Sequence, residues 1–222
     1  MEPIVDKLIS LDDMRQHLFS AVVCDALDSV GLVHQSPRLS WQPMTTEGVL
    51  VGRCKTTLWG EMFHSDPKPY ELELRAVDSI CPNEVLIAAA GGSRRSGIWG
   101  ELLSTAAAQR GCRGAIVDGT VRDLRQMQAM EFPVWAMGVS PYDSRDRNRV
   151  VDVNVPVEMD GVIFSPGDLV IADLDGVVVV PQKVEVEVIQ IAWEKVHSEN
   201  DFRDSIKNGM TATEAFNHYG IL

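Results

Sequence analysis

The sequence predicts a mixed α/β fold in a single domain of 222 residues. Three observations lead to this class. Hydrophobic residues make up 45% of the chain, which is enough to bury one substantial core. Short β-branched runs alternate with segments of helical periodicity, and turn residues separate them. No internal repeat, low-complexity segment or flexible linker divides the chain, so residues 1–222 are expected to form one domain.

The N-terminal part predicts one amphipathic helix over about residues 10–31. Ser10 and Asp13 form a capping pattern, hydrophobic residues then recur at helical spacing, and Gly31 ends the run. From Gly48 onward, short apolar runs between turn residues predict strands instead. In the central part we expect strands at Val49–Val51, Cys54–Trp59, Val85–Ala90, Gly114–Val117 and Phe132–Ala136, and helices at Leu102–Gln109 and Val121–Met130.

The C-terminal third begins with four β-branched runs separated by turn residues, which predicts a compact β meander. These runs are Val150–Val155, Val162–Phe164, Leu169–Ala172 and Val177–Val180. After Pro181, the spacing of Val184, Val188 and Ile191 is helical. A helical region is therefore expected over about residues 182–222.

Charge and composition exclude several kinds of partner. With 20 Lys and Arg against 32 Asp and Glu, the net charge of -12 would repel a nucleic-acid backbone. No apolar run approaches the roughly 20 residues that span a bilayer, and acidic groups stand where a signal peptide has a basic start. The cysteines and histidines are dispersed and match neither a disulfide framework nor a zinc spacing. We therefore expect a cytoplasmic protein that binds neither nucleic acid nor membranes.

A glycine-rich segment is the first candidate for a functional site. Residues 88–103 read AAAGGSRRSGIWGELL, which predicts an apolar strand, a glycine-rich loop and the start of a helix. The free N–H groups at a helix N-terminus favour an anion such as a carboxylate or a phosphate. The segment contains neither of the common glycine-rich nucleotide signatures. An ordinary tight turn is the alternative interpretation.

A second candidate loop, Asp118–Asp123, follows the expected strand at Gly114–Val117. Ligands of open α/β sheets bind beyond the carboxyl ends of the strands, so both loops can face one pocket. Arg122 can hold a carboxylate through two hydrogen bonds, and Asp123 can supply an oxygen to a divalent cation. Taken alone, an Arg-Asp pair is more often an exposed ion pair.

Gly100-Glu101, twenty further residues and Arg122-Asp123 resemble the acidic-x20-Arg-Asp signature of the class II pyruvate aldolases. Their type enzyme is 4-hydroxy-4-methyl-2-oxoglutarate aldolase, and they share the RraA-like family with the regulator of ribonuclease activity A. The similarity covers most of the chain from about residue 20 onward. It includes Trp99–Leu103, Val117–Gly119, Phe132–Val134, Pro166–Asp173, Asp175–Pro181 and Tyr219–Leu222.

The resemblance implies that the substrate is bound by the backbone amides at the start of the expected helix and by one arginine side chain. They would hold the carboxylate and the oxo group of a small 2-oxo acid. The residues concerned are Gly100, Glu101, Leu102, Leu103 and Arg122. No motif fixes the residues that read the distal end of the substrate. Arg94, Arg95 and His64 are candidates, and surface charges are the alternative for the two arginines.

For catalysis, the resemblance implies Arg122, together with Asp123 as the ligand of Mg2+, for which Mn2+ or Co2+ can substitute. Glu101 occupies the acidic position of the signature, where Asp also occurs in the family, so the reach of its longer side chain stays open. A neighbouring subunit would contribute an acid from its C-terminal region. Glu199 is the first candidate and Glu194 the second; the alternative is that both are solvated helix carboxylates.

The implied protein is a divalent-metal-dependent lyase with a swivelling β/β/α fold of the RraA-like type, assembled as a homotrimer or homohexamer. It would cleave 4-hydroxy-4-methyl-2-oxoglutarate or 4-carboxy-4-hydroxy-2-oxoadipate-like acids to pyruvate, and it would decarboxylate oxaloacetate through the same enolate. The alternative within the family is a non-catalytic regulator that binds a ribonuclease. Arg122 and Asp123 argue against it, because a binding module has no need of a metal carboxylate beside a carboxylate-binding arginine.

Overall fold

A computed structural model describes residues 9–38 and 41–220 of the chain. Residues 1–8 lie outside the described residues. They begin the segment in which no signal peptide is expected. Ile221 and Leu222, the last two residues of the family resemblance, also lie outside the described residues.

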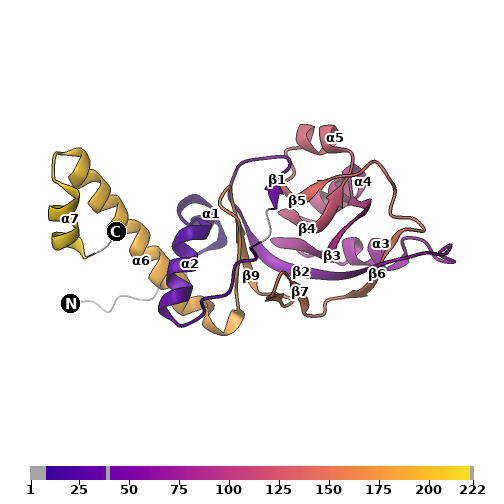
Figure 1. The fold of residues 1–222 in the computed structure, drawn as a ribbon, viewed down its shortest axis with the longest axis horizontal. Helices are drawn as coiled ribbons and strands as arrows, with labels where there is room; N and C mark the ends of the chain where they lie inside the picture. The colour runs from indigo at the N-terminus through magenta and orange to yellow at the C-terminus, as the bar shows by residue number, and fades with distance from the viewer. Residues whose placement is uncertain (1–8, 39–40, 221–222) are drawn as a thin grey trace.

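The core of the fold is a curled mixed sheet with the strand order β1-β5-β4-β3-β2-β9-β10, and β6 pairs with the far end of β2 (Figure 1). Strands β2 to β5 run parallel, whereas β1, β6, β9 and β10 pair antiparallel with their neighbours. Strands β7 and β8 form a separate hairpin. The strands are β1 Gln42–Pro43, β2 Leu50–Glu61, β3 Glu84–Trp99, β4 Gly114–Val121, β5 Val134–Val139, β6 Asn148–Val153, β7 Val157–Met159, β8 Val162–Phe164, β9 Leu169–Ala172 and β10 Val177–Val180.

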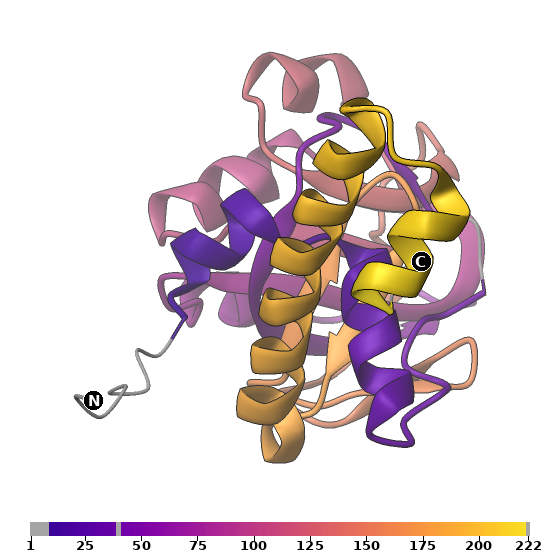
Figure 2. The same ribbon diagram turned by 90° about the vertical axis from the view of Figure 1, so that its left-hand side faces the viewer.

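Helices cover the sheet in two separate groups. Helices α3, α4 and α5 pack on β3, β4 and β5, whereas α1, α2 and α6 pack on β9 and β10 (Figures 1 and 2). Helix α7 folds back along the outer part of α6, where the Ser205 and Tyr219 hydroxyls lie 2.8 Å apart. The helices are α1 Leu11–His17, α2 Ser20–Ser29, α3 Glu71–Asp78, α4 Glu101–Gln109, α5 Leu124–Ala129, the 3-10 turn η1 Gln182–Val184, α6 Glu185–Lys207 and α7 Ala212–Tyr219. Among the described residues, no helix combines the length and hydrophobicity that a membrane crossing requires.

The expectation of one helix over residues 10–31 is wrong, because the chain breaks at Leu18 and Phe19. The predicted cap of α1 is present, with the Ser10 hydroxyl accepting from the Asp13 N–H and the Asp13 carboxylate accepting from Ser10. Leu18 and Phe19 then adopt extended backbone angles, and α2 starts at Ser20. The break lets Ser20 donate both its N–H and its hydroxyl to the Asp173 carboxylate, each at 2.6 Å.

The expected glycine-rich loop is part of a strand. Strand β3 continues to Trp99, and its pairing with β4 shifts register three times after Ala89. Gly91 and Gly92 take positive φ angles of 59° and 72° there, which glycine adopts without steric cost. The expected strand at Gly114–Val117 likewise extends to Val121, so the helix expected from Val121 begins at Leu124.

Two further expectations need correction. The predicted meander is divided, because β7 pairs with β8, whereas β6 and β9 pair with opposite ends of β2 and β10 pairs with β9. Helix α3 was not predicted. Its N-cap residue, Tyr70, has a left-handed backbone and no capping side-chain bond, so the usual start signal is missing.

Candidate active site

The two segments predicted to form the site meet at one edge of the sheet, although most of each belongs to a strand. Strands β3 and β4 are parallel neighbours, and Gly100 and Arg122 each follow one of them directly. The N–H of Arg122 donates to the carbonyl of Trp99 at 2.9 Å, which fixes the start of one segment against the end of the other. The sequence therefore brings Gly100 to Leu103 and Arg122-Asp123 together, as predicted.

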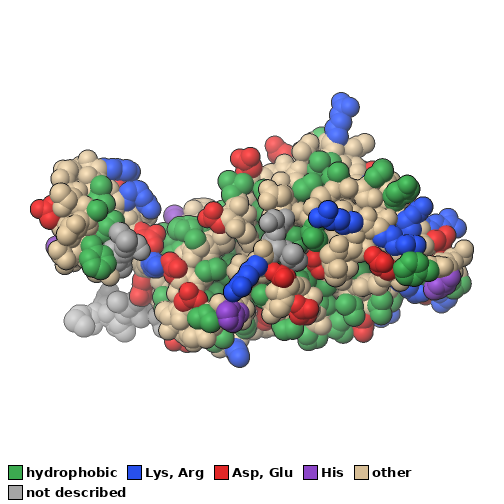
Figure 3. Space-filling model, viewed as in Figure 1, with side chains coloured by type: hydrophobic (Ala, Val, Ile, Leu, Met, Phe, Trp, Pro, Cys, Tyr) green, Lys and Arg blue, Asp and Glu red, His purple; other side chains and the backbone are tan. Residues whose placement is uncertain are grey.

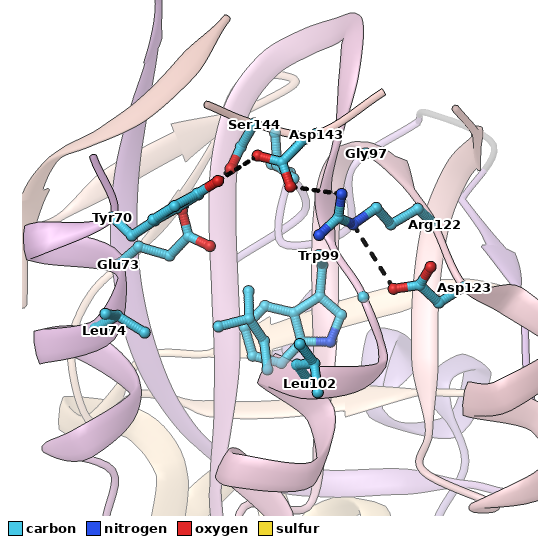
Figure 4. A pocket seen from close by; sticks show the side chains of 13 residues that line it. Tyr70, Glu73, Leu74, Gly97, Trp99, Leu102, Arg122, Asp123, Asp143 and Ser144 are labelled. Atoms are coloured by element: carbon cyan, nitrogen blue, oxygen red, sulfur yellow. Dashed lines mark hydrogen bonds and ion pairs between the residues drawn. The ribbon is translucent and has the colours of Figure 1, made fainter. Parts of the chain in front are cut away.

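The guanidinium of Arg122 lies between two carboxylates. Its Nη1 lies 2.5 Å from Oδ2 of Asp143, and its Nε lies 3.6 Å from Oδ2 of Asp123. The Arg122 side chain keeps 32% of its surface exposed. Two carboxylates thus orient the guanidinium while part of it stays open to an incoming anion (Figure 4).

Asp123 is the N-cap residue of α5, and its carboxylate contacts the N-terminal turn of α4. Its Oδ2 accepts from the backbone N–H of Glu101 at 3.3 Å, and its own φ of 56° places it in the left-handed region. A Cβ on Gly100 would lie 2.6 Å from that same Oδ2 and 3.0 Å from Cγ of Arg122. Glycine is therefore needed at this N-cap for Asp123 and Arg122 to approach the helix start.

These groups line a cavity of about 270 Å³. The first-turn N–H groups of an α-helix have no partner within the helix, and Leu102 and Leu103 of the first turn of α4 line the cavity. A ligand in the cavity thus meets a helix N-terminus and a guanidinium, which both favour negative charge. The lining residues are Tyr70, Glu73, Leu74, Gly97, Ile98, Trp99, Gly100, Leu102, Leu103, Arg122, Asp123, Asp143 and Ser144.

Sequence reasoning missed four polar residues of this cavity: Tyr70, Glu73, Asp143 and Ser144. The Tyr70 hydroxyl donates to Oδ1 of Asp143 at 2.7 Å, and burial together with this bond raises the pKa of Tyr70 to about 12. Burial raises the pKa of Asp143, but the bonds from Tyr70 and the Arg145 N–H and the charge of Arg122 outweigh it, so that pKa is lowered. Asp143 is therefore an anion that holds Arg122 in place.

Glu73 is the buried acid of the cavity, with 8% of its surface exposed. Burial raises its pKa to about 7, and the negative charge of Asp143 acts in the same direction. The bond from Ser144, at 3.4 Å, and the charge of Arg122 oppose the shift. A sequence signal for α3 exists in retrospect, because Leu72, Ala76 and other apolar residues recur at helical spacing after the turn residues 66–69.

The side chain of Glu101 points along α4 and not into the cavity. Its Oε1 accepts from the Thr105 hydroxyl at 2.8 Å, one helical turn further on. The residue contributes its backbone N–H to Asp123 instead. A catalytic role for the Glu101 carboxylate stays a prediction that requires the side chain to turn.

Glu194 and Glu199 lie on α6, on the far side of the sheet from the cavity (Figure 1). Glu194 accepts from Gln190 at 2.7 Å, and Glu199 lies 4.0 Å from Nζ of Lys195. Neither carboxylate reaches the cavity of its own chain. Only a neighbouring subunit can bring one of them there, so this assignment stays a prediction.

Of the three candidates for the distal end of the substrate, only Arg95 lines a hollow next to the cavity among the described residues. Lys and Arg side chains gather at the end of the molecule opposite α7 (Figure 3). A second, more open hollow of about 390 Å³ is lined by Arg95, Arg145 and Arg147 together with Asp143 and Asp146. Asp143 thus borders both hollows. Arg94 and His64 are exposed and line neither.

The described residues contain no group of three or more His, Cys, Asp or Glu side chains placed to hold a metal ion. A magnesium ion does not need such a group, because it binds through one or two carboxylates and keeps several waters. Asp123 offers one hard oxygen donor with 39% of its side chain exposed. The residues present therefore fit a hydrated Mg2+ next to a 2-oxo acid.

A match to a family model identifies the family of this chain. The model of the RraA-like family, described as Aldolase/RraA, matches residues 20–179. The chain belongs to the RraA-like family. A Halalkalibacterium halodurans protein provisionally named 4-hydroxy-4-methyl-2-oxoglutarate aldolase is 32% identical over 194 residues, 87% of each chain.

Solved structures confirm the predicted α/β fold of the RraA-like type. The crystal structure of an uncharacterized Pseudomonas syringae protein matches with a TM-score of 0.83 and 26% identity, over 94% of this chain and 93% of that one. The Streptomyces coelicolor protein RraAS2, described as an unusual member of the RNase ES inhibitor RraA protein family, matches with a TM-score of 0.77 and 26% identity. That match covers 87% of this chain and 94% of RraAS2.

Proposed function

We propose that this RraA-like protein is a divalent-metal-dependent lyase of the cytoplasm that acts on small 2-oxo acids. It cleaves 4-hydroxy-4-methyl-2-oxoglutarate or 4-carboxy-4-hydroxy-2-oxoadipate-like acids to pyruvate, and it decarboxylates oxaloacetate. One observation carries the proposal: the open N-terminus of α4, the Arg122 guanidinium and the Asp123 carboxylate converge on a single cavity.

The residues of the cavity match the charges of a 2-oxo acid. The first-turn N–H groups of α4 and the guanidinium of Arg122 bind the carboxylate and the oxo group. When the C3–C4 bond breaks, negative charge develops on the oxo oxygen of the pyruvate enolate. Arg122 stabilises that charge, and because Asp143 and Asp123 already orient the guanidinium, little reorganisation is required.

Asp123 is the residue that would hold Mg2+, with Mn2+ or Co2+ as substitutes. When bound, the ion supplies a positive charge that polarises the oxo group of the substrate. Asp123 keeps its carboxylate at this position because the N–H of Glu101 donates to it and Gly100 leaves it room.

A homotrimer or homohexamer would complete the site. The cavity is bordered by exposed Leu74 and Leu102, with 53% and 74% of their surfaces open. Exposed apolar side chains gathered next to a site favour an interface. A neighbouring α6 placed there would bring Glu199, or else Glu194, towards the substrate.

The second candidate function is restraint of a ribonuclease without catalysis. The similarity to RraAS2, a member of the RNase ES inhibitor family, supports it. The cavity favours the lyase instead, because a surface that only binds a protein does not require a guanidinium, a helix N-terminus and a carboxylate around one small hollow.

The test is pyruvate release from 4-hydroxy-4-methyl-2-oxoglutarate and from oxaloacetate, with and without Mg2+. Wild type is compared with Arg122→Ala, Asp123→Ala and the surface control Arg110→Ala, whose guanidinium pairs with the exposed Asp78 at 3.5 Å. We expect metal-dependent turnover in wild type and in the control, and a loss of at least about 100-fold in both site variants. No turnover of either substrate by folded wild type would contradict the proposal and favour the ribonuclease regulator.

A further inference from the structure

Glu73 is a buried acid in the cavity for which the substrate-binding roles above have no use. It lies on α3, with 8% of its surface exposed, and the Ser144 hydroxyl donates to its Oε2 at 3.4 Å. Carboxyl groups are rarely buried unless they are paired, because burial disfavours the charged form. The ion pairs of the described residues do not include Glu73. Its presence therefore calls for a functional explanation.

The position of Glu73 relates it directly to the site. It lines the same cavity as Arg122 and Asp123. Figure 4 shows Tyr70 and Glu73 on the opposite side of the cavity from Asp123, with the Glu73 carboxyl directed inward. A substrate held by its carboxylate and oxo group at Arg122 and α4 would have Glu73 on the opposite wall of the cavity.

The surroundings of Glu73 combine charges of both signs. Arg122 and Asp143 face it across the cavity, and Tyr70 precedes it on its own helix. On the other side, a small hollow is lined by Glu73 together with Arg149 of β6 and Asp66, whose side chains pair at 3.5 Å. Burial dominates over these groups and raises the pKa of Glu73 to about 7. A carboxyl that titrates near neutral pH can both accept and release a proton at working pH.

We propose that Glu73 is the general base that takes the proton from the 4-hydroxyl group of the aldol substrate. This assignment rests on the lyase function proposed above and adds a catalytic residue to it. The 4-hydroxyl proton moves to the Glu73 carboxylate, and the O–H electron pair forms the new C4 carbonyl. The C3–C4 bond breaks, and its electrons form the C2–C3 double bond of the pyruvate enolate. The enolate then takes a proton at C3 from water, and Glu73 returns its proton to water.

The proposal separates the two reactions of the site. Oxaloacetate loses carbon dioxide to give the same enolate, and that step removes no hydroxyl proton. Loss of the Glu73 carboxylate should therefore affect aldol cleavage and leave decarboxylation largely intact. Because decarboxylation still needs a folded site, it also reports on folding and substrate binding in each variant.

The experiment measures both reactions in wild type, Glu73→Gln and the matched control Glu71→Gln. Glu71 lies two residues away on the same helix and is exposed, and it pairs with Lys68 at 3.1 Å. We expect Glu73→Gln to lower kcat for aldol cleavage at least about 100-fold and to change decarboxylation by less than about threefold. Glu71→Gln should match wild type in both, and Glu73→Asp should recover part of the aldol activity.

The pH profile of wild type provides a second, variant-free test. For aldol cleavage, kcat/KM should fall below a pH of about 7 as Glu73 becomes protonated, and decarboxylation should lack this limb. Unchanged aldol cleavage in Glu73→Gln, or equal losses of both reactions, would overturn the role of Glu73 and leave the lyase function standing. A wild type inactive on both substrates would overturn the lyase function and this role with it.

Discussion

Two helices of this protein begin next to an aspartate, and the two starts differ in what they leave open. At α2, the Ser20 N–H and hydroxyl both donate to Asp173 at 2.6 Å, and Asp173 is only 8% exposed. At α4, Gly100 provides no side chain, and the Glu101 N–H reaches Asp123 at a longer 3.3 Å. The first start is closed by protein groups, whereas the second faces a cavity.

On the proposed function, the difference is one of availability: a helix N-terminus can bind an anion when neighbouring protein groups leave its N–H groups unsatisfied. Both starts have the same positive potential and a carboxylate within reach. At α2 the buried Asp173 carboxylate neutralises this potential by accepting from the Ser20 N–H and hydroxyl, so the arrangement stabilises the fold and does not leave this start open to a ligand. At α4 the glycine, the half-exposed Asp123 and the adjacent Arg122 keep it available for an anion. The following predictions test this contrast in order of decreasing effect.

Removing Asp173 should produce the largest effect, and it should be an effect on stability. Asp173→Ala leaves the buried N–H and hydroxyl of Ser20 without their acceptor, so we expect a loss of about 3–4 kcal/mol in unfolding free energy. Urea unfolding measures the loss. Asp175→Ala, an exposed neighbour, is the control and should change stability by less than about 0.5 kcal/mol. Equal losses in the two variants would show that the α2 start is not closed by Asp173.

A side chain at Gly100, the N-cap of α4, should lower the rate of turnover. In Gly100→Ala, the new Cβ would lie 2.6 Å from Oδ2 of Asp123, so the carboxylate must move away from the helix. We expect kcat/KM for pyruvate release to fall about 100-fold, equal to about 2.7 kcal/mol on the barrier, with stability nearly unchanged. Gly48→Ala is the control, because its Cβ would meet no atom within 4 Å. Wild-type turnover in Gly100→Ala would refute the need for an open start.

Glu73→Gln should stabilise the protein in a pH-dependent way. The pKa of Glu73 is about 7 in the folded state, against an ordinary value of 4.5. Between pH 4.5 and 7 the folded wild type therefore binds more protons than the unfolded chain, and its free energy of unfolding falls as the pH rises through this range. At pH 8 the glutamine variant should be more stable by about 2 kcal/mol, and at pH 4 the two should agree. Thermal unfolding at the two pH values measures this. A difference that is the same at both would contradict the buried, titrating carboxyl.

The smallest expected effect is at the Ser20 hydroxyl. Ser20→Ala removes one of the two bonds to Asp173 and keeps the N–H bond, so we expect a loss of about 1 kcal/mol. In the Asp173→Ala background the same substitution should have almost no further effect, because the partner is already gone. Additive losses in the double variant would mean that the two residues act independently.

Part of the fold followed from the sequence because its signals are local. The fully buried run of β4 and the alanine-rich α4 were predicted from composition and turn residues in their own segments. The break between α1 and α2 was missed for the opposite reason. No proline or glycine marks it, and the group that stabilises it, Asp173, lies 153 residues further along the chain.

The candidate site divides in the same way. Gly100 and Arg122-Asp123 could be predicted, since each directly follows a strand and carries a recognisable motif. Glu73 was missed because α3 has helical spacing but no capping signal, and Asp143 could not be predicted because it lies in a connection whose path depends on tertiary structure. Their roles depend on burial and on the position of Arg122, and a sequence pattern shows neither.

Binding of pyruvate tests the central contrast most directly, because it requires the open α4 start but no chemistry. Calorimetric titration with pyruvate in the presence of Mg2+ would compare wild type, Arg122→Ala and Ser20→Ala. We predict saturable binding in wild type and in Ser20→Ala, and a loss of at least about tenfold in affinity in Arg122→Ala. Equal pyruvate affinity in wild type and Arg122→Ala would contradict the account, because the anion would then bind elsewhere than at the α4 start.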